Sequence, residues 1–216
     1  MKSLTLDETV LAQGVTELIA IDADLASIYN RLGLPPLWAR EPGFPTLVHI
    51  ILEQQVSIAS ARAAFDKLKA AVDPLTPHGV LELDDESLRR IGFSRQKTLY
   101  VRHLAQAIVT GSLDLNAMAE MADDDVRKQL VALKGIGPWS AEIYLLMALC
   151  RADAWPAGDL GVIVAAQSIK GLPTRPAVTE LNEIAEAWRP WRAVATRLLW
   201  HHYLSKPDVT PPAALG

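Results

Sequence analysis

The sequence contains a single cysteine, Cys150, in 216 residues. One cysteine excludes an internal disulfide, a zinc site built on cysteines and an iron–sulfur cluster held by the chain. No apolar run approaches the roughly 20 residues that are needed to cross a bilayer. The first ten residues, MKSLTLDETV, lack the apolar stretch of a signal peptide. These absences favour a cytoplasmic protein with no membrane partner.

The sequence also lacks an excess of basic residues. It has 21 Lys and Arg against 25 Asp and Glu, which gives a net charge of −4. Proteins that bind nucleic acids usually carry a basic footprint, so the total charge does not point to such a partner. A local basic face remains compatible with this total, because affinity depends on the charges that lie beside the phosphates.

Alternation of polar and apolar residues, which is typical of half-buried strands, is missing too. Apolar residues instead recur at helical spacing, and we expect an all-α fold with two helical lobes flanking a cleft. The domain is expected to cover residues 1–205, followed by a proline-rich tail at 206–216. The expected helices cover residues 11–19, 25–32, 44–54, 57–70, 94–111, 123–133, 138–149, 159–169 and 178–203, the last broken at Pro190.

A tight hairpin is expected in the segment LVALKGIGPWSAE, at residues 130–142. Gly135 can adopt the positive φ of a helix end, and Pro138 suits the first turn of the next helix. Such a turn gathers backbone N–H groups and a positive helix end at one point, which suits a DNA phosphate. The alternative is a hairpin that only joins two packed helices.

This hairpin resembles that of the helix-hairpin-helix DNA glycosylase superfamily, which reads L-P-G-[IV]-G, although Lys134 replaces the usual proline. The resemblance implies that double-stranded DNA contacts the turn, formed by Gly135, Ile136 and Gly137. It implies no required cofactor, but a monovalent cation, Na⁺ or K⁺, often bridges such turns to phosphate. Its ligands would be the backbone carbonyls of three residues: Val131, Leu133 and Ile136.

Asp159 opens a helix after the turn PAG, in the stretch PAGDLGV. An Asp in this place is usually an N-cap, and helix dipole and backbone donors favour its ionised form. A fixed negative charge can stabilise the oxocarbenium-like state of glycosidic cleavage, and it can orient or deprotonate the attacking water. The superfamily has its catalytic Asp at this distance from the hairpin. Asp153 and Glu142 compete for the role, but neither lies where a turn is predicted to meet a helix.

Trp139 stands two residues after the second hairpin glycine, where strand-cutting members of the superfamily carry a lysine. Without this amine, cleavage should be hydrolytic and leave an abasic site. An indole can also stack on a cationic alkylated base and stabilise it by about 0.5 to 2 kcal/mol. The alternative is that Trp139 is a core aromatic.

Two further segments resemble the 3-methyladenine DNA glycosylase II (AlkA) family. These are ILEQQVSIASARAAFDKL, at residues 51–68, and AWRPWRAVATRLLW, at residues 187–200. The base-stacking tryptophan of that family matches Trp200, whereas Trp188 and Trp191 are interpreted as packing residues. The resemblance spans roughly residues 35 to 205 and implies the compact form, without the N-terminal β-rich domain of longer members.

Gln54 and Gln55 fall between two expected helices. In the resemblance to the AlkA family, Gln55 matches the residue that fills the gap left in DNA by a flipped base. The alternative is a pair of exposed loop glutamines. Arg95 and Lys97 resemble a family segment that can touch phosphate, although lone basic residues at a helix start are often only solvated. His201 and His202 have no partners at metal spacing and are given no role.

The predicted function is removal of alkylated bases, of the 3-methyladenine and 7-methylguanine type, by a monofunctional glycosylase in base excision repair. The protein would act as a monomer on DNA in a bacterial-type cytoplasm, in association with the nucleoid. Two alternatives remain, a glycosylase/lyase for oxidised or mismatched bases and a non-catalytic DNA-binding module. The ranking of damaged bases depends on pocket shape, which the sequence does not reveal.

Overall fold

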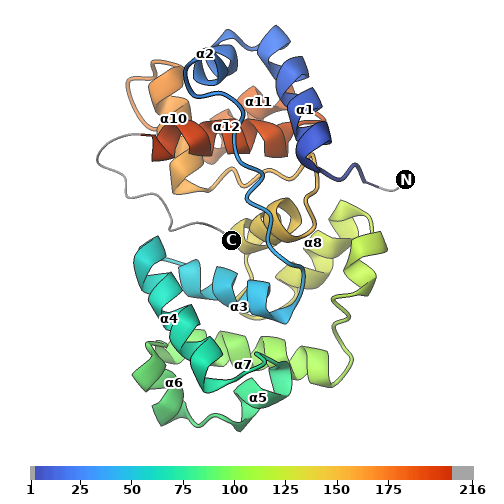
Figure 1. The fold of residues 1–216 in the computed structure, drawn as a ribbon, viewed down its shortest axis with the longest axis vertical. Coiled ribbons are helices and arrows are strands. Elements are labelled where there is room, and N and C mark those ends of the chain that lie inside the picture. The colour runs from blue at the N-terminus through green and yellow to red at the C-terminus, as the bar shows by residue number, and fades with distance from the viewer. Residues whose placement is uncertain (1–2, 206–216) are drawn as a thin grey trace. The chain divides into compact units, whose positions relative to one another are not determined.

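The computed structural model describes residues 3–205, and the predicted tail at 206–216 lies outside the described residues. The chain forms two compact units, which Figure 1 shows with their helices labelled. The middle unit contains Arg40–Tyr144. The terminal unit contains Ser3–Ala39 together with the chain from Leu145 onward, so both ends of the sequence contribute to it.

The middle unit is organised around α3, Phe44–Glu53, which is buried along almost its whole length. Its neighbours in the unit are α4 and α7, and both pack against it. This burial explains why α3 lacks a polar face in the sequence. The other elements of the unit are α4 (Ile58–Ala71), α5 (Pro77–Glu82), α6 (Asp85–Ile91), α7 (Arg95–Val109), the 3₁₀ turn η1 (Ala117–Glu120), α8 (Asp123–Val131) and α9 (Pro138–Ile143).

The terminal unit is built around α12, Arg192–Leu204, which packs against α10, α2 and α1. Trp188 and Trp191 precede α12, and both are buried. Their indole N–H groups donate to acids of the α1–α2 region: Trp188 to Asp22 over 2.8 Å and Trp191 to Glu17 over 2.6 Å. The predicted packing role of both residues is therefore confirmed. The helices of this unit besides α12 are α1 (Glu8–Ile21), α2 (Ala23–Leu32), α10 (Leu160–Ile169) and α11 (Val178–Glu186).

The all-α prediction is confirmed for residues 3–205, where the only sheet-like pairing is an isolated bridge between Thr5 and Arg151. The helix starts expected at residues 57 and 94 are confirmed, because the hydroxyls of Ser57 and Ser94 each accept a backbone N–H three residues on. The single helix expected at 138–149 is wrong in its second half. There the chain winds into a π-helical turn, η2, at Tyr144–Ala148. No helix in the described residues has the length and apolar character to traverse a bilayer.

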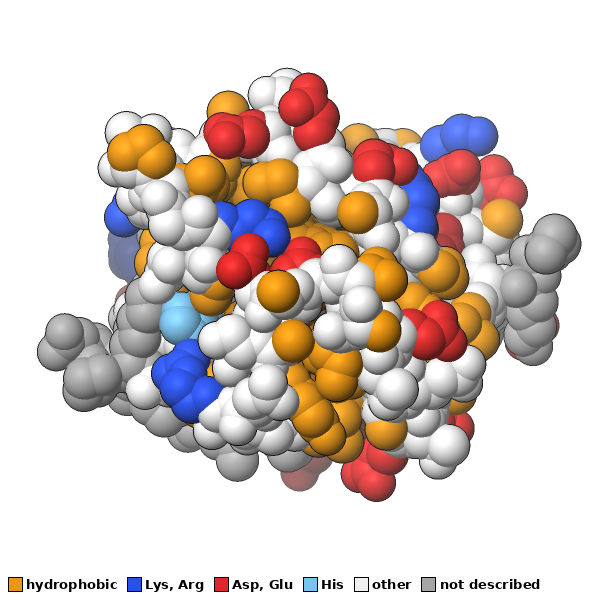
Figure 2. All heavy atoms as spheres, turned by 90° about the horizontal axis from the view of Figure 1, so that it is seen from above, with side chains coloured by type: hydrophobic (Ala, Val, Ile, Leu, Met, Phe, Trp, Pro, Cys, Tyr) orange, Lys and Arg blue, Asp and Glu red, His pale blue; other side chains and the backbone are white. Residues whose placement is uncertain are grey.

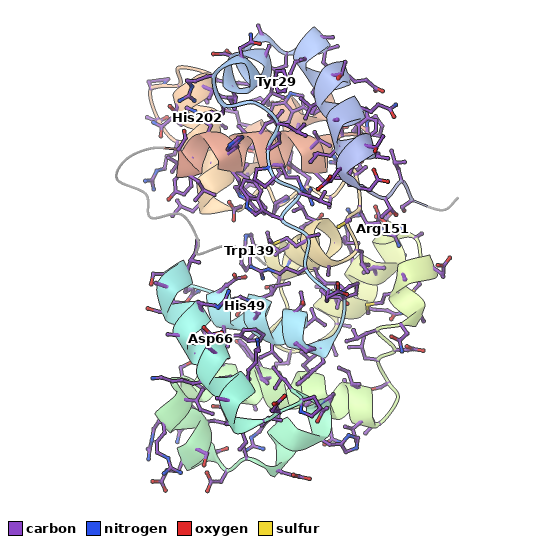
Figure 3. The ribbon with its side chains drawn as sticks, viewed as in Figure 1. Tyr29, His49, Asp66, Trp139, Arg151 and His202 are labelled. Atoms are coloured by element: carbon purple, nitrogen blue, oxygen red, sulfur yellow. The ribbon has the colours of Figure 1, made fainter. Side chains whose placement is uncertain are left out.

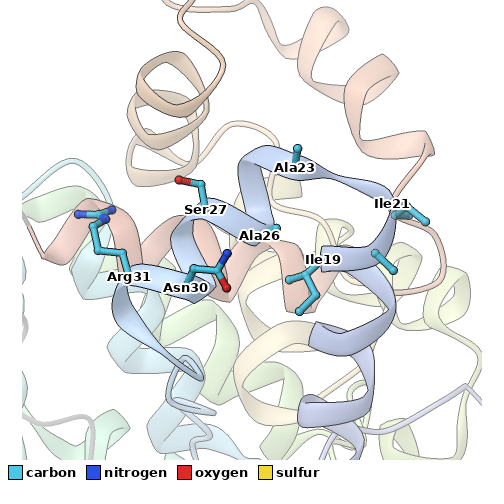
Figure 4. Close-up of a pocket in the computed structure, with 8 residues that line it drawn as sticks. Ile19, Ile21, Ala23, Ala26, Ser27, Asn30 and Arg31 are labelled. Atoms are coloured by element: carbon cyan, nitrogen blue, oxygen red, sulfur yellow. The ribbon is translucent and has the colours of Figure 1, made fainter.

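Two surface features of the described residues involve none of the site residues that the sequence predicts. Acidic side chains are scattered over the face in Figure 2 and basic ones are few, so this face lacks a basic cluster that would bind phosphate. A hollow of about 670 Å³ lies at the α1–α2 corner of the terminal unit (Figure 4). Its lining mixes apolar side chains such as Ile19 and Ile21 with Asn30 and Arg31.

Candidate functional site

Asp159 lies at the N-terminal end of α10 in the terminal unit and is partly buried. Its Oδ1 accepts the backbone N–H of Val162 over 3.0 Å, which confirms the predicted N-cap. The same oxygen accepts the indole N–H of Trp200 over 2.9 Å. A carboxylate held by two donors has a restricted orientation, which is what a positioned charge or base needs.

Trp200 comes from α12, so α10 and α12 together bring these two predicted site residues into contact. Gly161 makes this close approach possible. A Cβ at Gly161 would lie 3.1 Å from Oδ1 of Asp159, 3.2 Å from Cδ1 of Trp200 and 3.3 Å from Cδ1 of Tyr203. Any side chain at position 161 would therefore press on the pair.

A second indole, Trp38, meets the ring of Trp200 edge to face, with 6.1 Å between ring centroids and 69° between ring planes. Trp38 also lies edge-on to His201, at 6.3 Å. It comes from the coil between α2 and α3, which carries no motif. No local sequence signal links Trp38 to residues about 160 positions further on, so its place beside Trp200 is visible only in the structure.

Arg197 lies one turn before Trp200 on α12 and is fully buried. Its guanidinium donates to the carbonyls of Leu37 over 2.7 Å, Ala193 over 3.0 Å and Leu146 over 2.8 Å. Burial lowers the pKa of Arg197 to about 10, so the group stays protonated at neutral pH. The sequence analysis missed this residue too, since an arginine on a helix is usually exposed.

In the middle unit the hairpin turn has the predicted form. Gly135 has a φ of +97°, and Pro138 begins α9. A Cβ at Gly135 would lie 2.1 Å from Cγ of Tyr100, so both backbone conformation and packing require glycine here. Ile136 is buried, and its backbone N–H donates to the carbonyl of Leu133 over 3.1 Å.

The side chain of Gln54 is directed at this hairpin. Its amide Nε2 donates to the carbonyl of Gly135 over 2.8 Å and to the hydroxyl of Ser140 over 2.9 Å. Gln54 thus connects the end of α3 to the hairpin turn. This is a bracing contact within the unit, and the DNA contact predicted for Gln54 stays a prediction.

Gln55 is exposed and has a φ of +58°, which is uncommon for a residue with a side chain. Two apolar neighbours, Val56 and Ile58, are 45% and 42% exposed, although hydrophobic side chains usually seek the core. The 54–58 loop therefore presents two polar side chains, Gln55 and Ser57, and two apolar ones to solvent. Val56 and Ile58 were not singled out by the sequence analysis.

Trp139, labelled in Figure 3, is the second residue of α9 and is partly buried. It belongs to the middle unit, whereas Asp159 and Trp200 belong to the terminal unit. Of the basic residues predicted to touch phosphate, Arg95 is exposed at the start of α7. Lys97 donates to the carbonyl of Leu52 over 2.6 Å, at the C-terminal end of α3, and burial lowers its pKa. The phosphate contacts of both residues stay predictions.

The two acids that competed with Asp159 are engaged in ion pairs within their own units. Asp153 accepts from Arg189 and Arg192, and Glu142 accepts from Arg127. These pairs give both carboxylates a structural role. Asp159 caps α10 and accepts the indole N–H of Trp200.

Comparisons with known proteins identify the family to which the chain belongs. The family model of the HhH-GPD superfamily base excision DNA repair protein matches residues 48–190. The chain is 28% identical over 165 residues to DNA-3-methyladenine glycosylase 1 of Schizosaccharomyces pombe, which covers 74% of this chain and 72% of that protein. It spans 64% of the length of another relative, YfjP of Bacillus subtilis, with 28% identity over 184 residues.

Solved structures extend the similarity to the fold. The DNA-3-methyladenine glycosidase of Bacillus halodurans aligns with a TM-score of 0.78 and 29% identity, covering 95% of this chain and 94% of that one. The S. pombe 3-methyladenine DNA glycosylase Mag1, in complex with abasic DNA, aligns with a TM-score of 0.82 and 24% identity, covering 89% and 95%. The matched family model covers most of the chain, and the protein therefore belongs to the HhH-GPD superfamily of base excision DNA repair proteins.

Proposed function

We propose that this protein is a DNA glycosylase that flips alkylated bases out of double-stranded DNA and cleaves their glycosidic bond in base excision repair. The observation that carries the proposal is the Asp159–Trp200 pair, a carboxylate at a helix N-terminus held by an indole N–H. The family membership and the relatives named as 3-methyladenine glycosylases support it. The similarity to a glycosylase in complex with abasic DNA supports DNA as the partner.

The chemistry follows from the carboxylate. As the bond between C1′ and the base nitrogen breaks, its electron pair leaves with the base and positive charge develops on the sugar. The negative charge of Asp159 stabilises this state, and the Asp159 carboxylate can take a proton from the water that attacks C1′. An alkylated base is cationic before cleavage and becomes neutral on leaving, so it needs less assistance than an unmodified base. The aromatic face of Trp200 favours binding of that cation.

The glycosylase is proposed to be monofunctional, because Trp139 occupies the place of the lysine that would form a covalent bond to the sugar. Water is then the only nucleophile, and the product is an abasic site in an intact strand. The protein is proposed to act as a monomer in a bacterial-type cytoplasm, where it would meet the nucleoid DNA.

Recognition of DNA is assigned to the middle unit. The hairpin turn at Gly135–Ile136–Gly137 would contact phosphate through its backbone N–H groups, and Arg95 would add charge. Backbone carbonyls can replace the water shell of a monovalent cation, and those of Val131, Leu133 and Ile136 are proposed to do so. The carbonyl of Leu133 already accepts one N–H, and its second lone pair remains for a cation. Gln55, with Val56 and Ile58 beside it, would fill the gap left by the flipped base.

The test is release of free base from methylated duplex DNA by wild type and Asp159→Asn, with strand integrity read before and after alkali. Asp7→Asn is a matched control, since Asp7 caps α1 in the same unit and Asn caps a helix equally well. We expect wild type and Asp7→Asn to release base and leave strands intact until alkali. Asp159→Asn should lose at least about 100-fold in rate, within the range for removing a preorganised electrostatic group.

Three results would contradict the proposal. Strand breaks before alkali would indicate a lyase step and contradict the monofunctional assignment. DNA binding without release of any base by wild type would favour a binding module. Equal rates for wild type and Asp159→Asn would remove Asp159 from the chemistry.

A further inference from the structure

Trp38 has a backbone conformation that is unusual for a residue with a side chain. Its φ is +47°, in the left-handed region that residues with a side chain seldom adopt. Such conformations are energetically unfavourable and persist only where the surroundings impose them. Trp38 is partly exposed, so its indole is not simply a core residue that repays this cost by full burial.

The surroundings that impose this conformation include Arg197. Its Nε donates to the carbonyl of Leu37, the residue just before Trp38, over 2.7 Å. Burying a guanidinium is costly unless its donors are satisfied, and here backbone carbonyls satisfy them. A buried cation thus holds the backbone at the point where the chain turns to present Trp38.

Trp38 is presented to the proposed catalytic pair. Its ring lies edge to face with that of Trp200, whose N–H is bonded to Asp159. In the proposed reaction the sugar carbon C1′ lies beside Asp159, so the base attached to C1′ extends into the space around Trp200. A purine is about as large as an indole, and the Trp38 ring is in edge-to-face contact with that of Trp200.

We propose that Trp38 is a specificity-determining residue that contacts the flipped base and, together with Trp200, selects cationic bases over neutral ones. The proposal rests on the proposed glycosylase function and deepens it. The negative face of an indole attracts a positive ring, and the attraction grows where water is excluded. A neutral base of similar size gains only dispersion contacts from the same two indole rings.

The first experiment compares two lesions in one duplex sequence, 7-methylguanine, which is cationic, and hypoxanthine, which is neutral. We expect Trp38→Leu to lower kcat/KM for 7-methylguanine by about 2- to 30-fold relative to hypoxanthine, the range that corresponds to one cation–π contact. Trp38→Phe should retain most of the preference, because a phenyl ring also has a negative face. Leu34→Ala, an exposed change in the same coil segment, serves as the control.

Two results would overturn the proposal. An equal loss for both lesions would mean that Trp38 only supports the fold. No change in either rate would mean that it does not contact the base. The unfolding midpoint of each variant, measured beside the rates, identifies a change that comes from destabilisation.

A second experiment does not depend on catalysis. Indole N–H signals are followed by NMR while 7-methylguanosine, a cationic nucleoside, or inosine, its neutral counterpart, is added to the full-length protein. The proposal predicts that 7-methylguanosine shifts the Trp38 and Trp200 signals at concentrations where inosine does not. If wild type excises neither lesion, the proposed function fails, but a selective shift of the Trp38 signal still supports the cation site. An unchanged Trp38 signal in that case overturns the site as well.

Discussion

The indole N–H of Trp200 donates to Oδ1 of Asp159 over 2.9 Å, so the proposed base-stacking residue also orients the proposed catalytic carboxylate. Trp200→Phe separates these two tasks, since phenylalanine keeps an aromatic face but has no N–H. A hydrogen bond to a charged group contributes about 1.5 to 3 kcal/mol, which corresponds to a loss in kcat of about 10- to 100-fold. KM should change little, because stacking is retained. Single-turnover kinetics on methylated duplex DNA would measure both quantities.

Trp188→Phe is the matched control for this change. Trp188 donates its indole N–H to Asp22 over 2.8 Å in the same unit, but as part of the packing around α12. We expect Trp188→Phe to lower the free energy of unfolding and to leave kcat of the folded protein unchanged. Equal kcat values for Trp200→Phe and wild type would show that the N–H of Trp200 does not position Asp159.

Gly161→Ala should separate stability from activity. Alanine is favoured over glycine inside a helix by about 1 kcal/mol, so α10 itself would be stabilised. The added methyl group, however, would lie 3.1 Å from Oδ1 of Asp159 and 3.2 Å from the Trp200 ring. We expect the pair to be displaced by a few tenths of an ångström and base release to slow by about 10-fold, because catalytic groups tolerate little misplacement. An unfolding midpoint at or above that of wild type, with slower base release, would match this expectation.

Much of the fold was predictable because its longer helices carry strong local signals. The caps at Ser57 and Ser94 and the N1 proline of α9 each act within one turn. The short helices α5 and α6 were missed, since six or seven residues are too few to show a period. The π-helical turn η2 was missed because its residues are as apolar as those of a helix.

The site was predictable only where a motif marks it. Asp159 was found from its turn-to-helix position and Trp200 from a family segment. The direction of a side chain is not encoded locally, so the inward turn of Gln54 toward the hairpin was missed. Trp38 contacts Trp200 and Arg197 binds the carbonyl of Leu37, in each case across about 160 residues of sequence, so no local pattern predicts these contacts.

The bracing of the hairpin by Gln54 leads to a prediction of coupling with the proposed wedge. Gln54→Leu keeps the size of the side chain but removes both bonds, to Gly135 and Ser140. If Gln54 acts by holding the neighbouring Gln55 in place, Gln54→Leu and Gln55→Ala should each slow base flipping, and the double variant should be no slower than Gln55→Ala. We expect a coupling of about 0.5 to 3 kcal/mol, the range for residues in contact.

Stopped-flow fluorescence of 2-aminopurine next to the lesion would measure flipping in the four proteins of this cycle. Ser140→Ala is a milder companion, because it removes only one of the two acceptors of Gln54. Additive effects of Gln54→Leu and Gln55→Ala would contradict the coupling and leave Gln54 as a stabiliser of the hairpin alone.

His49 should make the middle unit sensitive to mild acid. Its ring stacks on Phe65 at 4.3 Å between centroids and 4° between planes, and Nε2 lies 3.7 Å from Glu53 (Figure 3 labels His49). Burial is the main cause that lowers the pKa of His49 from 6.5 to about 4; the Glu53 carboxylate opposes the shift and Arg40 adds to it. The folded protein therefore takes up this proton less readily than the unfolded chain does.

The pH window follows from these values. Above pH 6.5 His49 is neutral in both the folded and the unfolded state, so it does not change the free energy of unfolding. Between pH 6.5 and about 4 the unfolded state binds more protons, so the free energy of unfolding decreases as the pH is lowered. At pH 5 the loss should be about 1 to 2 kcal/mol, with allowance for screening. His49→Phe keeps the stack on Phe65 but cannot titrate, so urea unfolding at pH 7 and pH 5 should show a smaller loss for this variant. Since the carboxylates titrate in both proteins, their difference isolates His49, and identical losses would show that its ring is solvated enough to be protonated in the folded state.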